Sequence, residues 1–397
     1  MTGISTLGQA LRQIENLNLQ QQQFATLSTQ LATGKKTQTY SGLNTDAITS
    51  VRARTSLTST DVYINNIDRS NITINLTLGA IEEFQAQTQE FAKTSINFLQ
   101  QGDHQTGDIV YYDDPATPEV ETIIVGNTSA NMDVEYSAIV DHANNLFGFL
   151  GELLNSQEGD RYLLAGADGR TKPFTDTGTL EASISTLILE WKDGNITTEE
   201  LIADLYDGEA SAANPNAITD SAIGFSAPIT NGSAGDIFVR ADENSEFKYT
   251  TLANERSLRD VIVTMAFLKN ENLPPIVNSY ETSTYPAPPD QRGAPGATAS
   301  EQQDSFYELY NVLATKANTT IDDIDQIRFR LETVRAQMTE TKQAHANEKS
   351  LLLDTVANIE DVDTNEVAVR LTTLQTQLQA SYSVTSLTQN LSLVNFL

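Results

Sequence analysis

Both ends of this chain are almost free of charge, and this constrains the fold more than any other feature of the sequence. The first 34 residues carry two charges, Arg12 and Glu15, and residues 371–397 carry none, although the chain has 24 basic and 53 acidic residues. Chain termini are normally frayed and solvated. Apolar residues at helical spacing, diluted with Gln, Ser, Thr and Asn, instead predict a long amphipathic helix at each end that is buried against another surface.

These two stripes are the candidate assembly interface. In a single copy the apolar faces would be poorly covered, whereas a helical array of copies closes them through heterologous contacts, so we expect a homo-oligomer. The stripe of the N-terminal helix consists of Ile4, Leu7, Leu11, Ile14, Leu17, Phe24, Leu27 and Leu31. The stripe of the C-terminal helix consists of Leu371, Leu374, Leu378, Val384, Leu387, Leu391, Val394 and Leu397.

Composition excludes several classes of function. The formal charge is −29, and most of it falls in residues 103–300, so nucleic acid is a poor partner, because phosphate binding needs a basic patch. The chain has no cysteine, which rules out disulfides and thiol chemistry. Its start lacks the basic and apolar regions of a signal peptide. The C-terminal stripe is too polar to cross a bilayer, so we expect no membrane insertion.

Sustained seven-residue spacings predict further long helices. Ile67, Ile74 and Ile81 lie seven residues apart, and Ile324, Ile327 and Leu331 follow the alternating spacing of a coiled-coil seam. The fold class is therefore expected to be mainly α, an elongated antiparallel helical rod built from both chain ends and carrying an inserted α+β domain. The expected domains are 1–34 with 360–397 (terminal helices), 45–174 with 301–359 (helical rod), and 175–300 (inserted domain and linker).

The middle of the chain has a different pattern. Residues 103–133 contain short β-branched runs, and residues 134–155 predict a helix. After Gly159 the sequence is rich in glycine and asparagine and is expected to be β-like, with two strands flanking a turn at 242–245 and a helix at 255–269. Prolines in 271–300 predict a linker.

Three segments resemble the bacterial flagellin family, and within it the members that join hook to filament. LSTQLATGKKT (27–37) resembles a family signature, with Leu27, Leu31, Thr33 and Gly34 matching, and IEDVDTNE (359–366) resembles the start of its C-terminal segment. GDRYLLAGADGRTKPF (159–174) resembles a segment typical of the junction members. The matching residues of this last segment include Arg161, Tyr162, Gly166, Pro173 and Phe174.

The resemblance implies a structural, non-enzymatic subunit of the bacterial flagellum that joins hook to filament. It further implies export without a cleaved signal, an extracellular location, and a helical array in which the adjacent partners are another hook-associated protein and flagellin. An export chaperone on the C-terminal helix would keep that exposed apolar face from aggregating. Neither a cofactor nor a metal is expected.

Local patterns that are similar to catalytic or binding motifs have simpler interpretations. GKKT (34–37) follows a helix and lacks the spacing of a phosphate loop, so it predicts a helix end whose lysines interact with the helix dipole. The acidic groups at 322–325 and 361–363 do not follow a calcium loop; they predict a solvated face and a helix break. The histidines His104, His142 and His345 lack ligand spacing, and Trp191 is expected in a small core.

Two other functions stay open at this point. A filament flagellin shares the terminal helices, although residues 159–174 and the ending LSLVNFL favour a junction subunit. A soluble coiled-coil scaffold predicts terminal helices that are ordered in the monomer, whereas an axial subunit predicts ends that become ordered only on assembly. An enzyme in the inserted domain would need convergent titratable residues in a pocket, and no such pattern is evident.

Overall fold

The computed structural model describes residues 3–101, 107–112, 121–126, 129–211, 214–270, 273, 294–295 and 299–394. Its contacts divide the chain into two units, Met1–Asn65 with Thr341–Leu397, and Asn66–Glu340. The division falls inside two long helices, α2 (Ala47–Gln101) and α9 (Ala299–Glu360). The expected fold, mainly helical with long helices at both ends that pack together, is confirmed.

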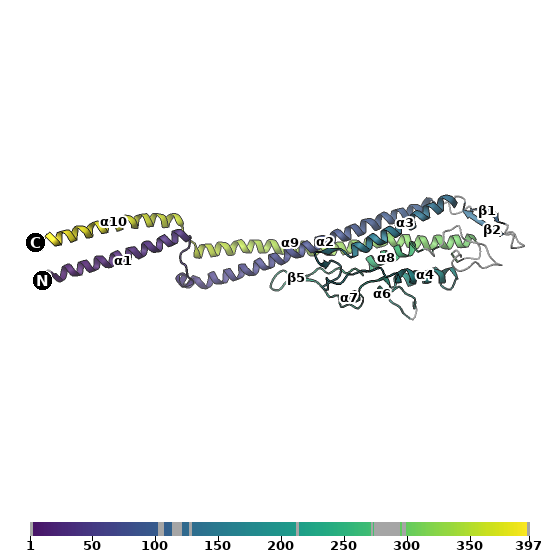
Figure 1. Cartoon of the computed structure of the whole chain (residues 1–397), viewed down its shortest axis with the longest axis horizontal. Helices are drawn as coiled ribbons and strands as arrows, with labels where there is room; N and C mark the ends of the chain where they lie inside the picture. Colours follow the sequence, from purple (N-terminus) through teal and green to yellow (C-terminus); the bar gives the residue numbers. More distant parts are fainter. Residues whose placement is uncertain are drawn as a thin grey trace. The chain divides into compact units, whose positions relative to one another are not determined.

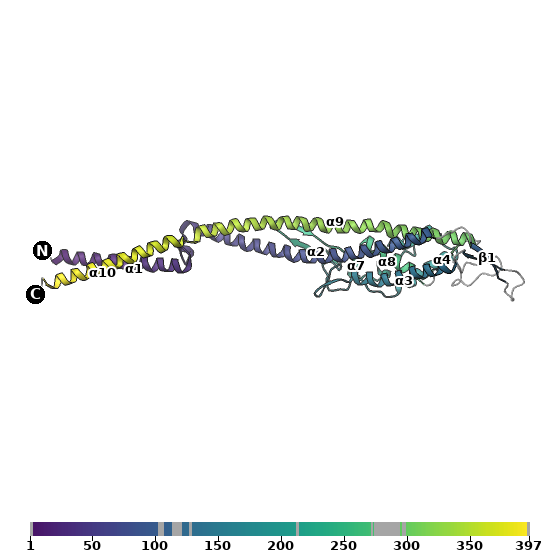
Figure 2. The same cartoon turned by 90° about the horizontal axis from the view of Figure 1, so that it is seen from above.

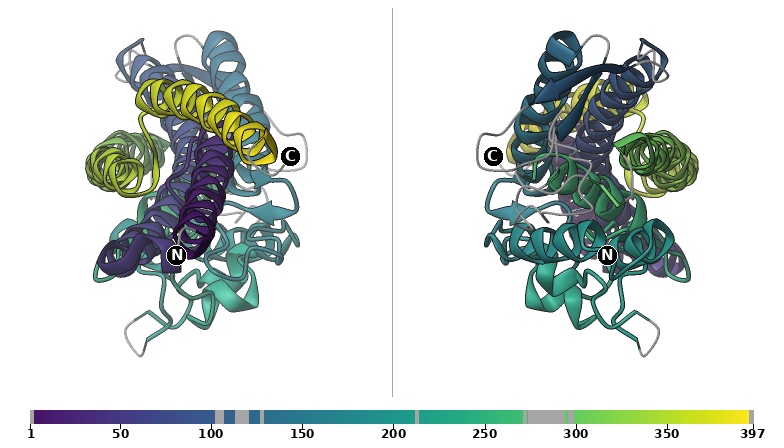
Figure 3. Two further views of the ribbon diagram at one scale, coloured as in Figure 1. Left: turned by 90° about the vertical axis from the view of Figure 1, so that its left-hand side faces the viewer. Right: turned by 90° about the vertical axis from the view of Figure 1, so that its right-hand side faces the viewer.

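The first unit contains the two terminal helices, α1 (Gly3–Thr33) and α10 (Thr364–Val394). They pack against each other as an antiparallel pair, with both chain ends at the same end of the pair (Figure 1). Figure 3 (left) shows the purple α1 and the yellow α10 crossing, viewed from the side of the termini. A 3₁₀ segment, η1 (Tyr40–Asp46), connects α1 to α2.

The start of α2 and the end of α9 form a second antiparallel pair in this unit. The rings of Tyr63 and His345 stack with their centroids 5.5 Å apart, and His345 is 6% exposed. Asp61 and Lys349 form an ion pair at 2.6 Å on the outside of the same pair. His345 is therefore a packed structural residue.

In the second unit, the residues of α2 at seven-residue spacing are buried, and α2 contacts α9 at separate points. Phe98 packs edge-on against Tyr310 with 5.1 Å between ring centroids, and Gln85 Nε2 donates to Asp325 Oδ1 at 2.8 Å. Figure 1 shows α2 crossing α9, and Figure 2 shows the same two helices from above. The buried large apolar residues of α2 in this unit are Ile67, Ile74, Leu78, Ile81, Phe84, Phe91 and Phe98. A strict seven-residue repeat favours a left-handed supercoil.

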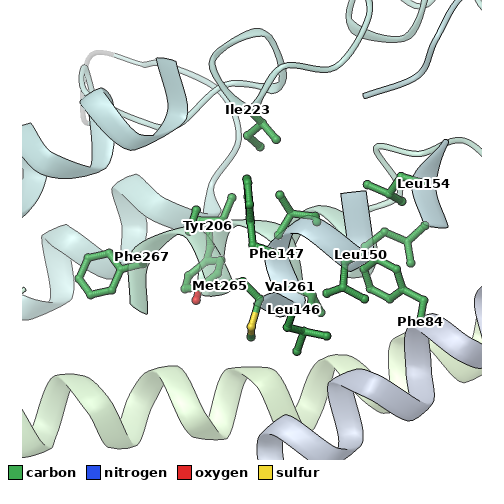
Figure 4. Packing of buried hydrophobic residues seen from close by; sticks show 14 of the residues in the cluster. Phe84, Leu146, Phe147, Leu150, Leu154, Tyr206, Ile223, Val261, Met265 and Phe267 are labelled. Atoms are coloured by element: carbon green, nitrogen blue, oxygen red, sulfur yellow. The ribbon is translucent and has the colours of Figure 1, made fainter. Parts of the chain in front are cut away.

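Helices α3 (Ser129–Leu154) and α8 (Arg256–Leu268) fill the centre of the second unit. They contact each other, and α8 is so enclosed that every residue from Ser257 to Leu268 is buried. Figure 4 shows Leu146, Phe147 and Leu150 of α3 beside Val261 and Met265 of α8, with Phe84 of α2 at the edge. The side chains of 66–340 thus form one continuous apolar core.

The segment after Gly159 differs from its β-like prediction. Two-residue strands, β3 (Gln157–Glu158) and β4 (Arg161–Tyr162), pair on either side of Gly159, and four helices follow: α4 (Thr179–Lys192), α5 (Thr198–Tyr206), α6 (Asp220–Ile223) and α7 (Ala227–Thr230). Apolar residues at helical spacing, Leu180, Ile184 and Leu187 among them, outweigh the local glycines, and these three side chains are buried. Trp191 lies in this core with no exposed surface, and its Nε1 donates to Thr198 Oγ1 at 3.1 Å.

The remaining strands form two antiparallel hairpins. The predicted strands around 242–245 are β5 (Phe238–Arg240) and β6 (Glu246–Lys248), with Val239 opposite Phe247. The β-branched runs within 103–133 contain β1 (Gly107–Tyr112), which pairs with β2 (Glu121–Gly126). Most of the expected linker at 271–300 lies outside the described residues, as does His104.

Candidate assembly interface

The stripe of α1 is largely uncovered in a single copy. Leu11 and Ile14 are 58% and 54% exposed, and Leu31 is 38% exposed. Leu17, Phe24 and Leu27 are half-buried. Ile4 and Leu7 lie in α1, but their side chains are outside the described part of the structure. Exposed leucine and isoleucine side chains each represent about 1–2 kcal/mol of burial free energy that a partner surface can recover.

The stripe of α10 divides into a covered half and an open half. Leu374 and Leu378 are buried and Leu371 is half-buried, whereas Val384 and Leu387 are 51% and 62% exposed. Leu391 and Val394 lie in α10 with side chains outside the described part, and Leu397 lies beyond it entirely. The structure therefore buries Leu374 and Leu378 of the α10 stripe and leaves Val384 and Leu387 exposed.

Amide and hydroxyl side chains fix the register of the two helices. Gln21 Nε2 donates to the hydroxyl oxygen of Tyr382 at 2.7 Å, and Ser381 Oγ donates to Gln20 Oε1 at 3.3 Å. These polar residues dilute the apolar stripes in the sequence. Because uncharged groups can pair with one another when water is excluded, they suit a surface that becomes buried on assembly better than charges do.

Two adjoining grooves run along the α1–α10 pair. One of about 680 Å³ lies between residues 19–30 and residues 369–377, and the other, of about 470 Å³, lies between residues 13–23 and residues 380–385. Arg370 is the one charged residue among the residues that line them. Leu19 and Val369, 52% and 67% exposed, border these grooves, and neither was among the predicted interface residues because each lies off its stripe.

Gly34 ends α1 as the sequence predicted. Its φ of +68° is the left-handed conformation of a helix C-cap, and its N–H donates to the carbonyl oxygen of Gln30 at 2.8 Å. The two following lysines do not simply accompany the helix dipole: Lys35 pairs with Glu360 and Asp361, and Lys36 Nζ donates to the carbonyl oxygen of Asn358. This corrects the dipole interpretation, which could not anticipate partners more than 320 residues away.

The segment 159–174 serves the core of the second unit. Phe174 is 4% exposed and lies edge-on to Phe147 and Phe225, with ring centroids about 6 Å away. Pro173 is buried, and its carbonyl oxygen accepts from the N–H of Ser226 at 2.9 Å.

The other end of this segment forms a tight turn. A Cβ on Gly166, whose φ is +70°, would lie 2.7 Å from the carbonyl oxygen of Gly235. Arg161 and Tyr162 form β4, and the N–H of Tyr162 donates to the carbonyl oxygen of Gly169. In this chain the segment therefore fastens the loops at 225–235 to α3.

The acidic groups lie where the sequence placed them. Asp322 and Asp323 are exposed on α9, and Asp363 caps α10 by accepting from the N–H groups of Asn365 and Glu366. Gln85 and Arg328 donate to Asp325 and lower the pKa of its carboxyl group. His142 packs against Phe91. Among the residues that the structure describes, no cluster of three metal-ligating side chains occurs, and no helix is both long and apolar enough to cross a bilayer.

Comparison with known proteins gives one family match. Residues 314–397, which comprise most of α9 and all of α10, match the bacterial flagellin C-terminal helical region. Among solved structures, the chain is similar to a protein of Vibrio parahaemolyticus assigned as a flagellar hook-associated protein. The two share 8% identity with a TM-score of 0.45, over 79% of this chain and 97% of that one. No curated protein matches the sequence.

Proposed function

We propose that this chain is a structural, non-enzymatic axial subunit of the bacterial flagellum. The observation that carries the proposal is the antiparallel pair of charge-poor helices, α1 and α10, whose C-terminal member lies within the match to the flagellin C-terminal helical region. In this function the open stripes, with Leu11 and Leu387 as their most exposed described members, are covered by other copies in a helical array. The predicted interface residues of α1 and α10 would then form the surfaces that bind neighbouring copies.

The finer proposal is a hook–filament junction subunit of the hook-associated protein 3 type. Its support is the segment 159–174, whose Arg161, Tyr162, Gly166, Pro173 and Phe174 fit the junction pattern and which is built into the core of this chain. The neighbours would be another hook-associated protein on one side and flagellin on the other. Export without a cleaved signal, a chaperone on α10 and an extracellular location belong to the same proposal.

Binding of the purified chain to isolated hook fragments and filament fragments tests both levels. A junction subunit binds hook ends, stops after a limited number of layers, and then supports addition of flagellin. A filament flagellin instead elongates filament fragments without limit, which would overturn the finer proposal and keep the coarser one. Binding to neither fragment, with a stable monomer whose terminal helices are ordered, would favour a soluble coiled-coil scaffold and overturn both.

A further inference from the structure

The two connections to the terminal helices lie side by side in the first unit. α1 is followed by Gly34–Lys36, and α9 is followed by residues 361–363 before α10 begins. The N–H of Lys36 donates to the carbonyl oxygen of Glu360 at 2.7 Å, and the N–H of Val362 donates to that of Gly34 at 3.0 Å. Lys35 and Asp361 thus face each other as a short antiparallel bridge, so that neither connection moves without the other.

One carboxylate joins these connections to α2. Glu360 is 8% exposed, and Arg54 donates to it twice, through Nε at 2.8 Å and Nη2 at 2.5 Å. Ser50 Oγ donates to the same carboxylate at 2.5 Å, and Lys35 Nζ lies 3.4 Å from it. The donors therefore come from two segments, the first turns of α2 and the loop after α1, while the acceptor is the last residue of α9.

The hydrogen bonds and ion pairs of Glu360 outweigh the free-energy cost of burying its carboxylate. A buried carboxylate is unfavourable unless its oxygens are hydrogen-bonded, and a forked guanidinium contact is the geometry that best satisfies it. The Arg54 guanidinium, followed by Ser50 and Lys35, lowers the pKa of Glu360 from its usual 4.5 to about 2. By contrast, the Lys35–Asp361 pair is 39% and 45% exposed, so screening by water leaves it a small contribution.

We propose that Glu360 locks the two connections into a single joint, which ties the α1–α10 pair to the start of α2. The lock needs no second copy, because every donor belongs to the same chain, so it goes beyond the assembly proposed above. It also marks the boundary of the ordered part of the isolated chain, at the backbone pairing of Lys36 and Val362. The terminal helices can fray while the backbone pairing at Lys36 and Val362 stays closed.

Amide hydrogen exchange of the full-length monomer, resolved to single residues, tests the lock. The reporters are the N–H groups of Lys36 and Val362, and the N–H of Ala253, bonded to Leu164 in the second unit, monitors global opening. Arg54→Met and Glu360→Gln should speed exchange of both reporters about tenfold or more, because each removes a charge-assisted contact. Arg54→Lys, which keeps the charge but loses the fork, should give an intermediate rate.

Arg370→Gln is the matched control, because it breaks an exposed ion pair with Glu366 on α10 at the same 2.5 Å separation. It should leave both reporters within about twofold of wild type. Unprotected Lys36 and Val362 amides in the wild-type monomer would overturn the lock, as would rates unchanged in Arg54→Met and Glu360→Gln. An equal rise in the exchange rate of the Ala253 amide would also overturn it, because the variants would then be destabilising the whole chain. Failure of the chain to bind flagellar fragments leaves this result unaffected, so the two proposals fail separately.

Discussion

Asn155 and the backbone of Phe174 exchange two hydrogen bonds across 19 residues of sequence. The N–H of Phe174 donates to Asn155 Oδ1 at 3.0 Å, and Asn155 Nδ2 donates to the carbonyl oxygen of Phe174 at 2.9 Å. The same Nδ2 donates to the carbonyl oxygen of Gly151 at 2.8 Å. One amide side chain therefore closes the end of α3 and holds the segment 159–174 against it.

Replacement of Asn155 by leucine should destabilise the second unit by about 2–3 kcal/mol, because it leaves the N–H and carbonyl of Phe174 without partners in a part-buried site. The measurement is urea unfolding followed by the fluorescence of Trp191, the single tryptophan of the chain, which is fully buried in this unit. Thr94→Ala is the control, since Thr94 lies in the same unit and makes one exposed bond within α2, to the carbonyl oxygen of Glu90, and it should change stability by less than about 0.5 kcal/mol. Equal effects of the two variants would contradict the bridging role of Asn155.

Asn44 holds a backbone conformation that glycine adopts more readily. Its φ of 52° and ψ of −121° interrupt η1 and lie in a region that is strained for a residue with a Cβ. Asn44→Gly should therefore raise the free energy of unfolding of the first unit by about 1 kcal/mol, measured by circular dichroism. Gly34→Ala tests the opposite change. A methyl group has space at this position, but φ is +68°, so the free energy of unfolding should fall by about 1 kcal/mol. Destabilisation by Asn44→Gly would show that the asparagine side chain has a role that outweighs this strain.

The acid sensitivity of the joint follows from Glu360. Its pKa is lowered in the folded chain to about 2 from the usual 4.5, so the folded state holds this proton more weakly than the unfolded state. The stabilisation is fully present above about pH 4.5 and is lost as the pH falls towards 2, with an upper limit of about 3 kcal/mol. Thermal unfolding of the first unit at a series of pH values should show this step.

Other carboxyl groups titrate over the same range, so the comparison with Glu360→Gln isolates the contribution of Glu360. The stability difference between wild type and variant should shrink as the pH falls from 4.5 towards 2. A difference that is constant across this range would contradict the assignment.

The sequence predicts the elements that depend on local spacing. Ile67, Ile74 and Ile81 are seven apart and all three are buried along α2, because a repeat in one helix is sufficient to define its buried face. The break before α10 was equally local, since Asp363 caps the helix that follows it. The helices α4 and α5 were mistaken for β-like structure, because neighbouring glycines and asparagines obscured the spacing of residues such as Leu180 and Ile184.

The joint had no signal that a single sequence could supply. Arg54 and Glu360 are 306 residues apart, and nothing in the sequence around Arg54 distinguishes it from an ordinary surface arginine. Similarly, the stripe of α10 predicts an apolar face but not which of its residues α1 buries, because the register depends on side-chain pairs such as Gln21 and Tyr382. Contacts between distant segments, rather than helix spacing, were the missing information.

Self-assembly of a charged variant of α10 tests the central claim most directly. Leu387→Glu places a carboxylate on the open half of the stripe, where the native side chain is 62% exposed. Its effect on the monomer should therefore be small, while its burial between copies would cost several kcal/mol. Phe238→Glu is the matched control: the side chain is 55% exposed on β5, outside the terminal helices.

The three proteins are to be compared by sedimentation and electron microscopy after assembly is induced with ammonium sulfate, which strengthens apolar association. Our account predicts that the wild type and Phe238→Glu form sedimenting helical assemblies, whereas Leu387→Glu stays in the supernatant as a folded monomer. Assembly of Leu387→Glu to the same extent as wild type would show that the α10 stripe is not the surface that joins the subunits.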